Sequence, residues 1–207
     1  MSDWRESELA KRLDLIEDEV SIGGTRLVLL RPLDAAALVD EDDFAENEFL
    51  PYWADIWPAG LRLAEALPAD LHHQRLVELG CGLGLPSLMA AARGGEVLAT
   101  DWSTDAMALL AVNAARNDLE LRVQRVDWSE PGALLAEGAF DLVLAADVLY
   151  EARNAEWLLE LLPRLSATVL LADPGREVAK GFLVRAAAHF GIEDLGAGVS
   201  RLNAPRR

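Results

Sequence analysis

Three glycines and two flanking acids form the most informative pattern in the sequence. Glu78, Gly80, Gly82 and Gly84 follow the spacing E-x-G-x-G-x-G after a short apolar run, and Asp101 closes the next apolar run. Glycines between a strand and a helix let the backbone approach a ligand closely, and the free N–H groups of the helix start favour electron-rich atoms. An acid in the position of Asp101 can accept both hydroxyl protons of a ribose. The pattern therefore predicts a site for a nucleoside-containing ligand.

The position of the third glycine separates two classes of such ligands. The dinucleotide fingerprint G-x-G-x-x-G would need glycine at position 85, where the chain has Leu85. This disfavours a nicotinamide-dependent oxidoreductase. With Glu78 ahead of it, the spacing resembles motif I of the class I S-adenosylmethionine-dependent methyltransferases. The alternative is an α/β turn that binds no nucleotide.

Further candidate site residues stand where later strands are expected to end. Asp127 and Trp128 follow the segment LRVQRV, and Asp147 and Tyr150 lie at the end of FDLVLAADVLY. In open α/β sheets, ligands bind in the crevice outside the carboxyl ends of the strands. We therefore expect Asp127 and Trp128 beside an adenine. Asp147 could instead be a helix cap.

Trp57, Trp102 and Cys81 complete the set of candidates. Trp57 lies in the aromatic segment LPYWADIWPAG, and a tryptophan beside a sulfonium would gain cation–π stabilisation. The alternative, which we favour for Trp53, is that the ring packs a helix against the sheet. Trp102 directly follows Asp101. Cys81 has no histidine nearby in the sequence, so we interpret it as a small loop residue and not as a nucleophile.

The elements that position these residues alternate between strands and helices. We expect one helix to open at Pro86 and another to be capped by Ser103 or Thr104. A strand is expected over 167–173 and a helix over 178–190. This alternation predicts an α/β fold with a Rossmann-like, doubly wound, mostly parallel sheet.

The N-terminal part carries three weaker signals. Apolar residues at helical spacing indicate a short helix over 3–19, and alternation around a Gly-Gly pair predicts a β-hairpin over 19–31. Six acids gather within 40–48. Such a run is usually a solvated loop, and the alternative is a docking site for a basic substrate.

We expect a single domain over residues 1–207. It would consist of an N-terminal extension, 1–50, with the hairpin and the acidic loop, an S-adenosylmethionine-binding core, 51–190, and a short C-terminal strand and tail, 191–207. A complete seven-stranded methyltransferase sheet would need a long antiparallel hairpin at its end. The last residues have room for one strand or two very short ones.

Composition narrows the partners and the compartment. The net charge of −16 argues against nucleic acid as a partner and favours a basic one, although acidity can also serve solubility alone. The apolar runs are too short to span a bilayer, and the N-terminus lacks the apolar core of a secretory signal. The lone Cys81 suits a cytoplasmic protein. The three histidines offer no metal-ligand spacing, so we expect no metal.

The motifs, taken in order, resemble the seven-β-strand protein-lysine methyltransferases of family 16. The matching segments are YWADIWPAG, VELGCGLGLPSL, LATDW, VDW, FDLVLAADVLY and ADPGR. Within the family, the sequence looks most similar to the branch that includes the electron-transfer-flavoprotein β-subunit lysine methyltransferase. The resemblance implies S-adenosylmethionine as cofactor. The cofactor residues that it implies are Trp57, Gly80, Cys81, Gly82, Asp101, Asp127, Trp128 and Ala146.

The resemblance also implies methyl transfer to the side-chain amine of a lysine in a protein. In the D-x-x-Y motif, Asp147 would orient the lysine ammonium and Tyr150 would narrow the acceptor pocket. Enzymes that methylate adenine or glutamine usually carry prolines at this place, and their absence favours an aliphatic amine. The alternatives are a methyltransferase for a small-molecule amine or a protein N-terminus, and a non-catalytic adaptor that binds the cofactor.

Overall fold

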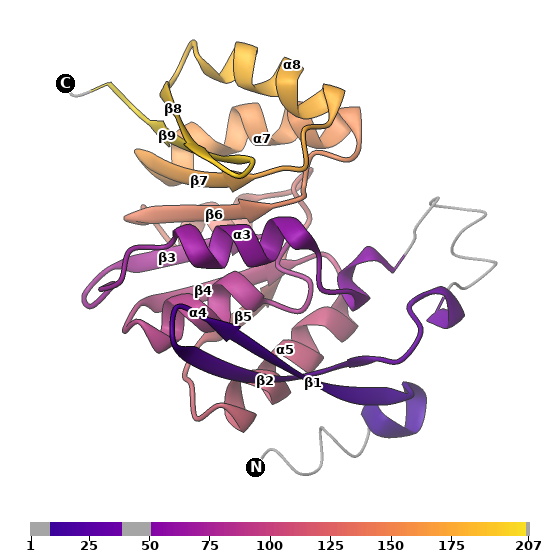
Figure 1. The fold of residues 1–207 in the computed structure, drawn as a ribbon. Coiled ribbons are helices and arrows are strands. Elements are labelled where there is room, and N and C mark those ends of the chain that lie inside the picture. Colours follow the sequence, from indigo (N-terminus) through magenta and orange to yellow (C-terminus); the bar gives the residue numbers. More distant parts are fainter. Residues whose placement is uncertain (1–8, 39–50, 206–207) are drawn as a thin grey trace.

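The computed structural model describes residues 9–38 and 51–205, and it shows a seven-stranded sheet preceded by a two-stranded hairpin (Figure 1). The strands are β1 Leu15–Ile22, β2 Thr25–Pro32, β3 Arg75–Leu79, β4 Glu96–Asp101, β5 Arg122–Arg125, β6 Leu142–Ala146, β7 Thr168–Ala172, β8 Gly191–Gly196 and β9 Val199–Asn203. The helices are α3 Pro58–Ala66, α4 Leu85–Ala92, α5 Thr104–Arg116, α6 Gly132–Ala136, α7 Ala152–Leu165 and α8 Glu177–Ala186, with short 3-10 turns at η1 Ala36–Leu38 and η2 Tyr52–Ala54.

In the large sheet the strands lie in the order β5-β4-β3-β6-β7-β9-β8. Strands β3 to β7 pair in parallel, whereas β9 runs antiparallel to both β7 and β8. The chain winds outward from β3 to β5 and then returns to place β6 on the other side of β3. Ligand crevices form at such a switch point. The predicted Rossmann-like, mostly parallel α/β fold and its N-terminal hairpin are confirmed.

Of the two arrangements expected over 191–207, a single short strand with a tail or two very short strands, the structure shows two strands. β8 and β9 pair with each other, and β9 also pairs with β7, so the hairpin completes the sheet. Gly196, Ala197 and Gly198 have positive φ angles of 84°, 53° and 78°. This left-handed turn reverses the chain tightly. A short segment can therefore hold both strands.

Helices cover both faces of the sheet, and this explains the nearly continuous apolar runs of its central strands. Leu76 and Ala99 belong to a core shared with α3, α4 and α5. Val77 and Leu79 belong to a second core shared with α6, α7 and α8. The carboxyl ends of β3, β4 and β6 are thereby fixed between two packed layers.

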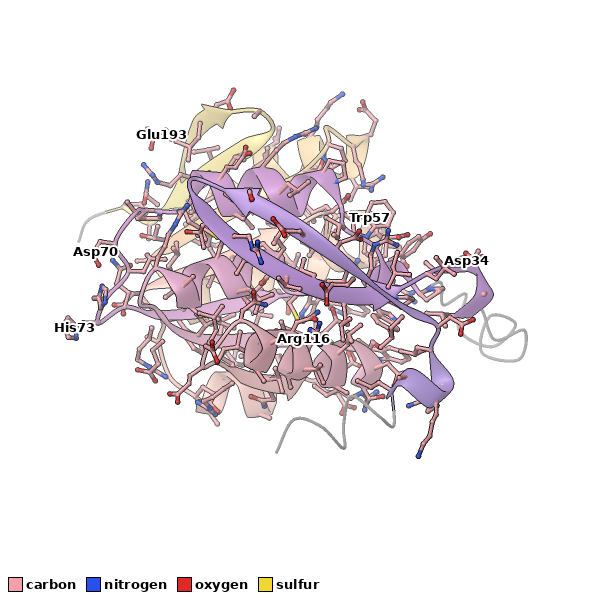
Figure 2. The ribbon with its side chains drawn as sticks, turned by 60° about the horizontal axis from the view of Figure 1, so that its bottom comes forward. Asp34, Trp57, Asp70, His73, Arg116 and Glu193 are labelled. Carbon is pink, nitrogen blue, oxygen red and sulfur yellow. The ribbon has the colours of Figure 1, made fainter. Side chains whose placement is uncertain are left out.

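The N-terminal hairpin lies on α5 and is longer than predicted, with eight residues in each strand. The side chain of Asn113 accepts a hydrogen bond from the N–H of Leu30 at 2.7 Å and donates one to its C=O at 3.0 Å. Asn117 does the same with Val28, at 2.8 and 2.7 Å. Figure 2 shows the hairpin crossing in front of α5, with Arg116 beside it.

Two predicted boundaries are wrong. In the described part of the expected helix over 3–19, only residues 9–12 are helical, because pairing with β2 makes β1 a strand from Leu15 onward. The apolar run 140–150 is a strand only over β6, because Asp147 adopts a φ of +57°, which leaves the strand region. The acidic residues at 40–48 lie outside the described residues.

No helix in the described part of the chain combines the length and the apolar character needed to cross a bilayer.

Candidate functional site

The glycine turn between β3 and α4 forms the centre of the candidate site. Gly80, Gly82 and Gly84 have φ angles of 65°, 52° and 72°. A Cβ on Gly82 would lie 3.1 Å from the backbone oxygen of Trp53, and one on Gly84 would lie 2.4 Å from Cδ1 of Leu110. Both positions therefore need glycine. The helix begins at Leu85, one residue earlier than predicted.

Glu78 lies behind this turn and is only 1% exposed. Its Oε2 accepts hydrogen bonds from the N–H of Ser87 at 2.8 Å and from the Ser87 hydroxyl, so it fixes the first turns of α4. Burial raises the pKa of Glu78 to about 8, although the bonds from Ser87 oppose the rise. In this arrangement Glu78 supports the glycine turn from inside, and its predicted role toward the cofactor becomes an indirect one.

The buried carboxyl of Glu78 should make stability depend on pH. The pKa is about 8 in the folded protein against a reference of 4.5, so unfolding releases a proton between these pH values. The free energy of unfolding should then fall as pH rises from about 4.5 to about 8, by on the order of 4 kcal/mol. Glu78→Gln keeps an oxygen for Ser87 and cannot ionise. Urea unfolding at pH 5 and pH 8 should show a smaller loss for the variant, and equal losses would contradict the assignment.

Asp101 ends β4 and ties the glycine turn to the start of α5. Its Oδ2 accepts a hydrogen bond from the N–H of Gly82 at 2.8 Å, and its Oδ1 accepts one from the N–H of Ser103 at 2.9 Å. Ser103 in turn caps α5 by accepting from the N–H of Ala106. Burial raises the pKa of Asp101, and its backbone hydrogen bonds lower it. Each carboxylate oxygen can accept further hydrogen bonds, as binding of two ribose hydroxyls would require.

Trp102 and Arg125 form a wall beyond Asp101. The guanidinium of Arg125 lies 5.3 Å from the centre of the Trp102 ring, and its Nε donates to the Trp102 carbonyl at 2.9 Å. A cavity of about 420 Å³ adjoins this wall. It is lined by Arg12, Leu13, Leu38, Pro51, Trp53, Trp102, Ser103, Thr104, Asp105 and Arg125. The cavity shares this wall with the site and does not include the glycine turn.

Trp128 lies against the glycine turn from the side of β5. A Cβ on Gly80 would lie 3.3 Å from Cζ2 of Trp128 and 3.0 Å from Cγ1 of Val148. Trp128 is half-buried, whereas Asp127 is exposed and accepts hydrogen bonds from the N–H and hydroxyl of Ser129 at 2.8 and 2.6 Å. The structure therefore brings Trp128 to the turn and leaves Asp127 beside it at the surface.

Replacing Trp128 with alanine is expected to weaken binding of S-adenosylmethionine while the fold stays largely intact. Stacking of a base on an aromatic ring contributes about 1 to 3 kcal/mol, which corresponds to a loss of roughly five- to 150-fold in affinity. Calorimetric titration, corrected for the folded fraction measured by circular dichroism, gives the affinity per folded molecule. An unfolded variant with normal affinity per folded molecule would show that the ring serves packing alone.

Asp147 has a partner that the sequence did not predict. Its Oδ1 accepts hydrogen bonds from Nε and Nη2 of Arg176, at 3.0 and 2.6 Å. The Asp147 side chain is 9% exposed and that of Arg176 is 38% exposed. Asp147 lies in the β6–α7 connection and Arg176 in the β7–α8 connection, so this ion pair joins two loops at the carboxyl ends of adjacent strands. It is neither a free carboxylate nor a helix cap.

Three exposed aromatic side chains, Tyr52, Trp57 and Tyr150, form a cluster that we call the aromatic rim. The ring centre of Tyr52 lies 5.2 Å from that of Tyr150 and 6.1 Å from that of Trp57. Nε1 of Trp57 also donates to the carbonyl of Tyr52 at 2.6 Å. Figure 2 shows Trp57 on the side of the molecule opposite to His73, which precedes β3.

The remaining candidates take backbone or packing positions. Cys81 is 7% exposed, and burial raises the pKa of its thiol well above the ordinary value. The thiol therefore stays protonated, as a small loop residue would. Ala146 is the last residue of β6 and pairs with Ala172 of β7. Trp53 is buried, as its predicted packing role requires.

The structure thus gathers most of the predicted residues on two sides of the glycine turn. Asp101, Trp102 and Trp128 lie on one side, and the aromatic rim with Asp147 lies at the ends of η2, α3 and β6. Sequence reasoning missed Arg176 and the contact of Tyr52 with both neighbours. The sequence holds a weak signal for each residue: Arg176 stands in ADPGR at the end of an expected strand, and Tyr52 stands in an aromatic segment. Neither signal indicates which residue would be contacted.

Comparisons with known proteins agree on one family. A family model described as "Lysine methyltransferase" matches residues 51–179. The chain is 31% identical over 154 residues to the protein N-lysine methyltransferase METTL21A of Danio rerio, covering 69% of this chain and 70% of that protein. It is 30% identical to the electron transfer flavoprotein beta subunit lysine methyltransferase of the same organism, covering 70% of this chain and 59% of the relative.

Solved structures resemble the chain in fold. A 16S rRNA methyltransferase (RsmC) of T. thermophilus, in complex with AdoMet and guanosine, matches with a TM-score of 0.68 at 18% identity, over 93% of this chain and 51% of that one. A fibrillarin of Aeropyrum pernix with bound S-adenosyl-L-methionine matches with a TM-score of 0.55 at 15% identity, over 71% of this chain and 73% of the other.

Proposed function

The chain belongs to the lysine methyltransferase family, and from this we propose that it transfers a methyl group from S-adenosylmethionine to a lysine side chain of a protein. The observation that carries the proposal is the glycine turn with Asp101 hydrogen-bonded to it, in a chain whose relatives are protein-lysine methyltransferases. The matches cover 70% of the length of the first relative and 59% of the length of the second.

The residues around the turn fit S-adenosylmethionine, which supplies an electrophilic methyl group on a sulfonium. Asp101 would hold the ribose hydroxyls and Trp128 would lie beside the adenine, with Trp102 as a second wall. Gly80 and Gly82 leave open the space that a Cβ would fill next to Trp128 and Trp53, which lets backbone approach the ligand. Trp57 and Ala146 complete the set implied by the family.

The acceptor side must supply a neutral amine. A lysine with a pKa near 10.4 is almost wholly protonated at pH 7, so the neutral form costs roughly 4 to 5 kcal/mol unless the site helps. An adjacent carboxylate raises that pKa, whereas desolvation lowers it. Because Arg176 already neutralises Asp147, Asp147 would not strongly oppose deprotonation. We assign Asp147 the role of positioning Tyr150, three residues along, by holding the loop.

Rate enhancement would then come mainly from orientation. Holding the amine nitrogen in line with the transferable methyl group is worth several kcal/mol when both are fixed. The Asp147–Arg176 pair joins the two loops at the acceptor side. Tyr150 lies in the same loop as Asp147, between β6 and α7. Partial burial of the Tyr150 side chain and the neighbouring carboxylate of Glu151 raise the pKa of its hydroxyl, which therefore stays protonated near neutral pH.

Labelled cofactor provides the test of the proposed function. The purified enzyme is incubated with methyl-labelled S-adenosylmethionine and a cytosolic extract, and the labelled proteins are hydrolysed for amino-acid analysis. Label is expected in methylated lysine. Label in small molecules alone, or on a protein N-terminus, would instead support the alternative acceptors, and no transfer with normal cofactor binding would support an adaptor.

The charge of the chain supports a basic protein segment as the acceptor. With a net charge of −16, the enzyme should attract such a segment through charges that salt screens. Raising NaCl from about 50 to about 500 mM should therefore lower the transfer rate at subsaturating substrate. A rate that does not change with salt would contradict electrostatic attraction. The same negative charge disfavours nucleic acid as a partner, because the phosphate backbone is also negative.

We also propose that residues 1–207 form a single domain and act in the cytoplasm. The large sheet includes β8 and β9 of the C-terminal segment together with the strands of the core. The N-terminal hairpin is hydrogen-bonded to α5. The chain has a single cysteine, Cys81, which is buried and has no second cysteine in the chain to pair with, and this suits a reducing compartment.

A further inference from the structure

The aromatic rim is exposed although its side chains are large and apolar. Tyr52, Trp57 and Tyr150 are 43%, 37% and 41% exposed. The chain contains only two tyrosines, and both belong to this cluster. Single exposed aromatic residues are common, but a cluster in which Tyr52 contacts both Trp57 and Tyr150 beside a candidate active site indicates a surface that is used.

The geometry of the rim suits a cation. The ring planes of Tyr52 and Tyr150 are inclined at 58° with centres 5.2 Å apart, and those of Tyr52 and Trp57 at 68° with centres 6.1 Å apart. A cation is attracted to an aromatic face within about 6 Å of its centre. Because all three side chains are partly exposed, a cation can approach one of these rings to within that range. Tyr52, the middle ring, contributes to either pair.

The carboxylate of Asp147, which lies in the same loop as Tyr150, is already paired with Arg176. Both side-chain nitrogens of Arg176 that contact Asp147 donate to its Oδ1, and the Asp147 side chain is 9% exposed. An arriving ammonium would have to displace a guanidinium in order to use that oxygen. The aromatic faces need no such exchange.

We propose that the aromatic rim binds the cationic side chain of the acceptor through its ring faces, and that Tyr52 is a specificity-determining residue of this surface. The inference rests on the proposed function and specifies how its acceptor is recognised. Ring faces attract a charge without requiring N–H donors, so methylation does not abolish the attraction, since a methylated ammonium keeps its positive charge. A carboxylate would instead lose hydrogen bonds with each added methyl group.

This difference makes choline the informative probe, because its quaternary ammonium has no N–H. Its uncharged control is 3,3-dimethyl-1-butanol, which has the same shape. The protein is labelled with 3-fluorotyrosine, so that only Tyr52 and Tyr150 give fluorine resonances. Titrations are carried out with S-adenosylhomocysteine bound, after calorimetry has shown that it binds. The cofactor site is then filled by a ligand without a sulfonium.

Choline is expected to shift both resonances in a saturable manner and to bind about fivefold or more tightly than dimethylbutanol. Tyr52→Phe, which also assigns the two resonances, should keep this preference because the ring remains. Tyr52→Leu should lose it, with Tyr150 as the reporter. Equal binding of the two probes, or a preference that survives in Tyr52→Leu, would overturn the proposal.

The result is separable from the proposed function. Methyl transfer to lysine with no preference for choline would leave the methyltransferase assignment in place and refute the role of the rim. Failure to bind S-adenosylhomocysteine would instead refute the cofactor assignment. If Tyr52→Leu lowers affinity for S-adenosylmethionine but not for S-adenosylhomocysteine, the ring serves the sulfonium of the cofactor, and the acceptor role is wrong.

Discussion

Replacing Asp147 with asparagine is expected to lower kcat/KM for methyl transfer by about a hundredfold while affinity for S-adenosylmethionine stays within a few fold. The variant keeps the shape of the side chain but removes the charge that pairs with Arg176. Loss of one partner from a nearly buried ion pair leaves the other uncompensated and frees the two loops that it joined. The affinity is measured by calorimetry and transfer with the labelled cofactor.

The partner of Asp147 supplies the control for this experiment. If Asp147 acts by positioning the loop, Arg176→Gln should cause a loss of similar size, and the double variant should lose little more than either single one. If Asp147 contacts the ammonium directly, Asp147→Asn should be far more damaging than Arg176→Gln. A variant Asp147→Asn as fast as the wild type would remove Asp147 from the site altogether.

Asp101→Ala should weaken binding of S-adenosylmethionine by about 2 to 3 kcal/mol, or roughly 30- to 150-fold. Two ribose hydroxyls would lose a charged acceptor, and the N–H groups of Gly82 and Ser103 would lose theirs. Part of the loss would therefore come from a looser glycine turn. Calorimetric titration measures the effect, and unchanged affinity in a folded variant would refute the ribose assignment.

A matched control removes one acid far from the site. Glu193 lies on β8, where it pairs with Arg201 of the same hairpin. Glu193→Ala changes the net charge by the same amount as Asp101→Ala. Cofactor affinity should be unchanged in this variant, which separates the loss of a specific acceptor from a general electrostatic effect.

The sheet core was predictable because its signals are local. Apolar runs between the glycine turn and the helices define strands buried on both faces, and Ser103 caps α5 as a serine before a helix should. The position of Asp101 next to Gly82 also follows from the spacing, because adjacent parallel strands bring their carboxyl ends together. Such features depend on residue type and short-range order.

The contacts that sequence reasoning missed depend on residues far apart in the chain. Asp147 and Arg176 are 29 residues apart, and their pairing requires both the register of β6 with β7 and the left-handed φ of Asp147. The burial of Glu78 is likewise set by how α4 packs over it. A charged side chain in a glycine motif is expected to face the ligand, whereas Glu78 bonds to Ser87 and holds the motif together.

The two asparagines of α5 also bear on how the molecule behaves in a crowded solution. An unpaired strand edge offers a row of N–H and C=O groups to which a strand of another molecule can add. Asn113 and Asn117 occupy those groups on Leu30 and Val28, as a neighbouring strand would. The helix thus closes one edge of a long hairpin against aggregation, with two side chains in place of a third strand.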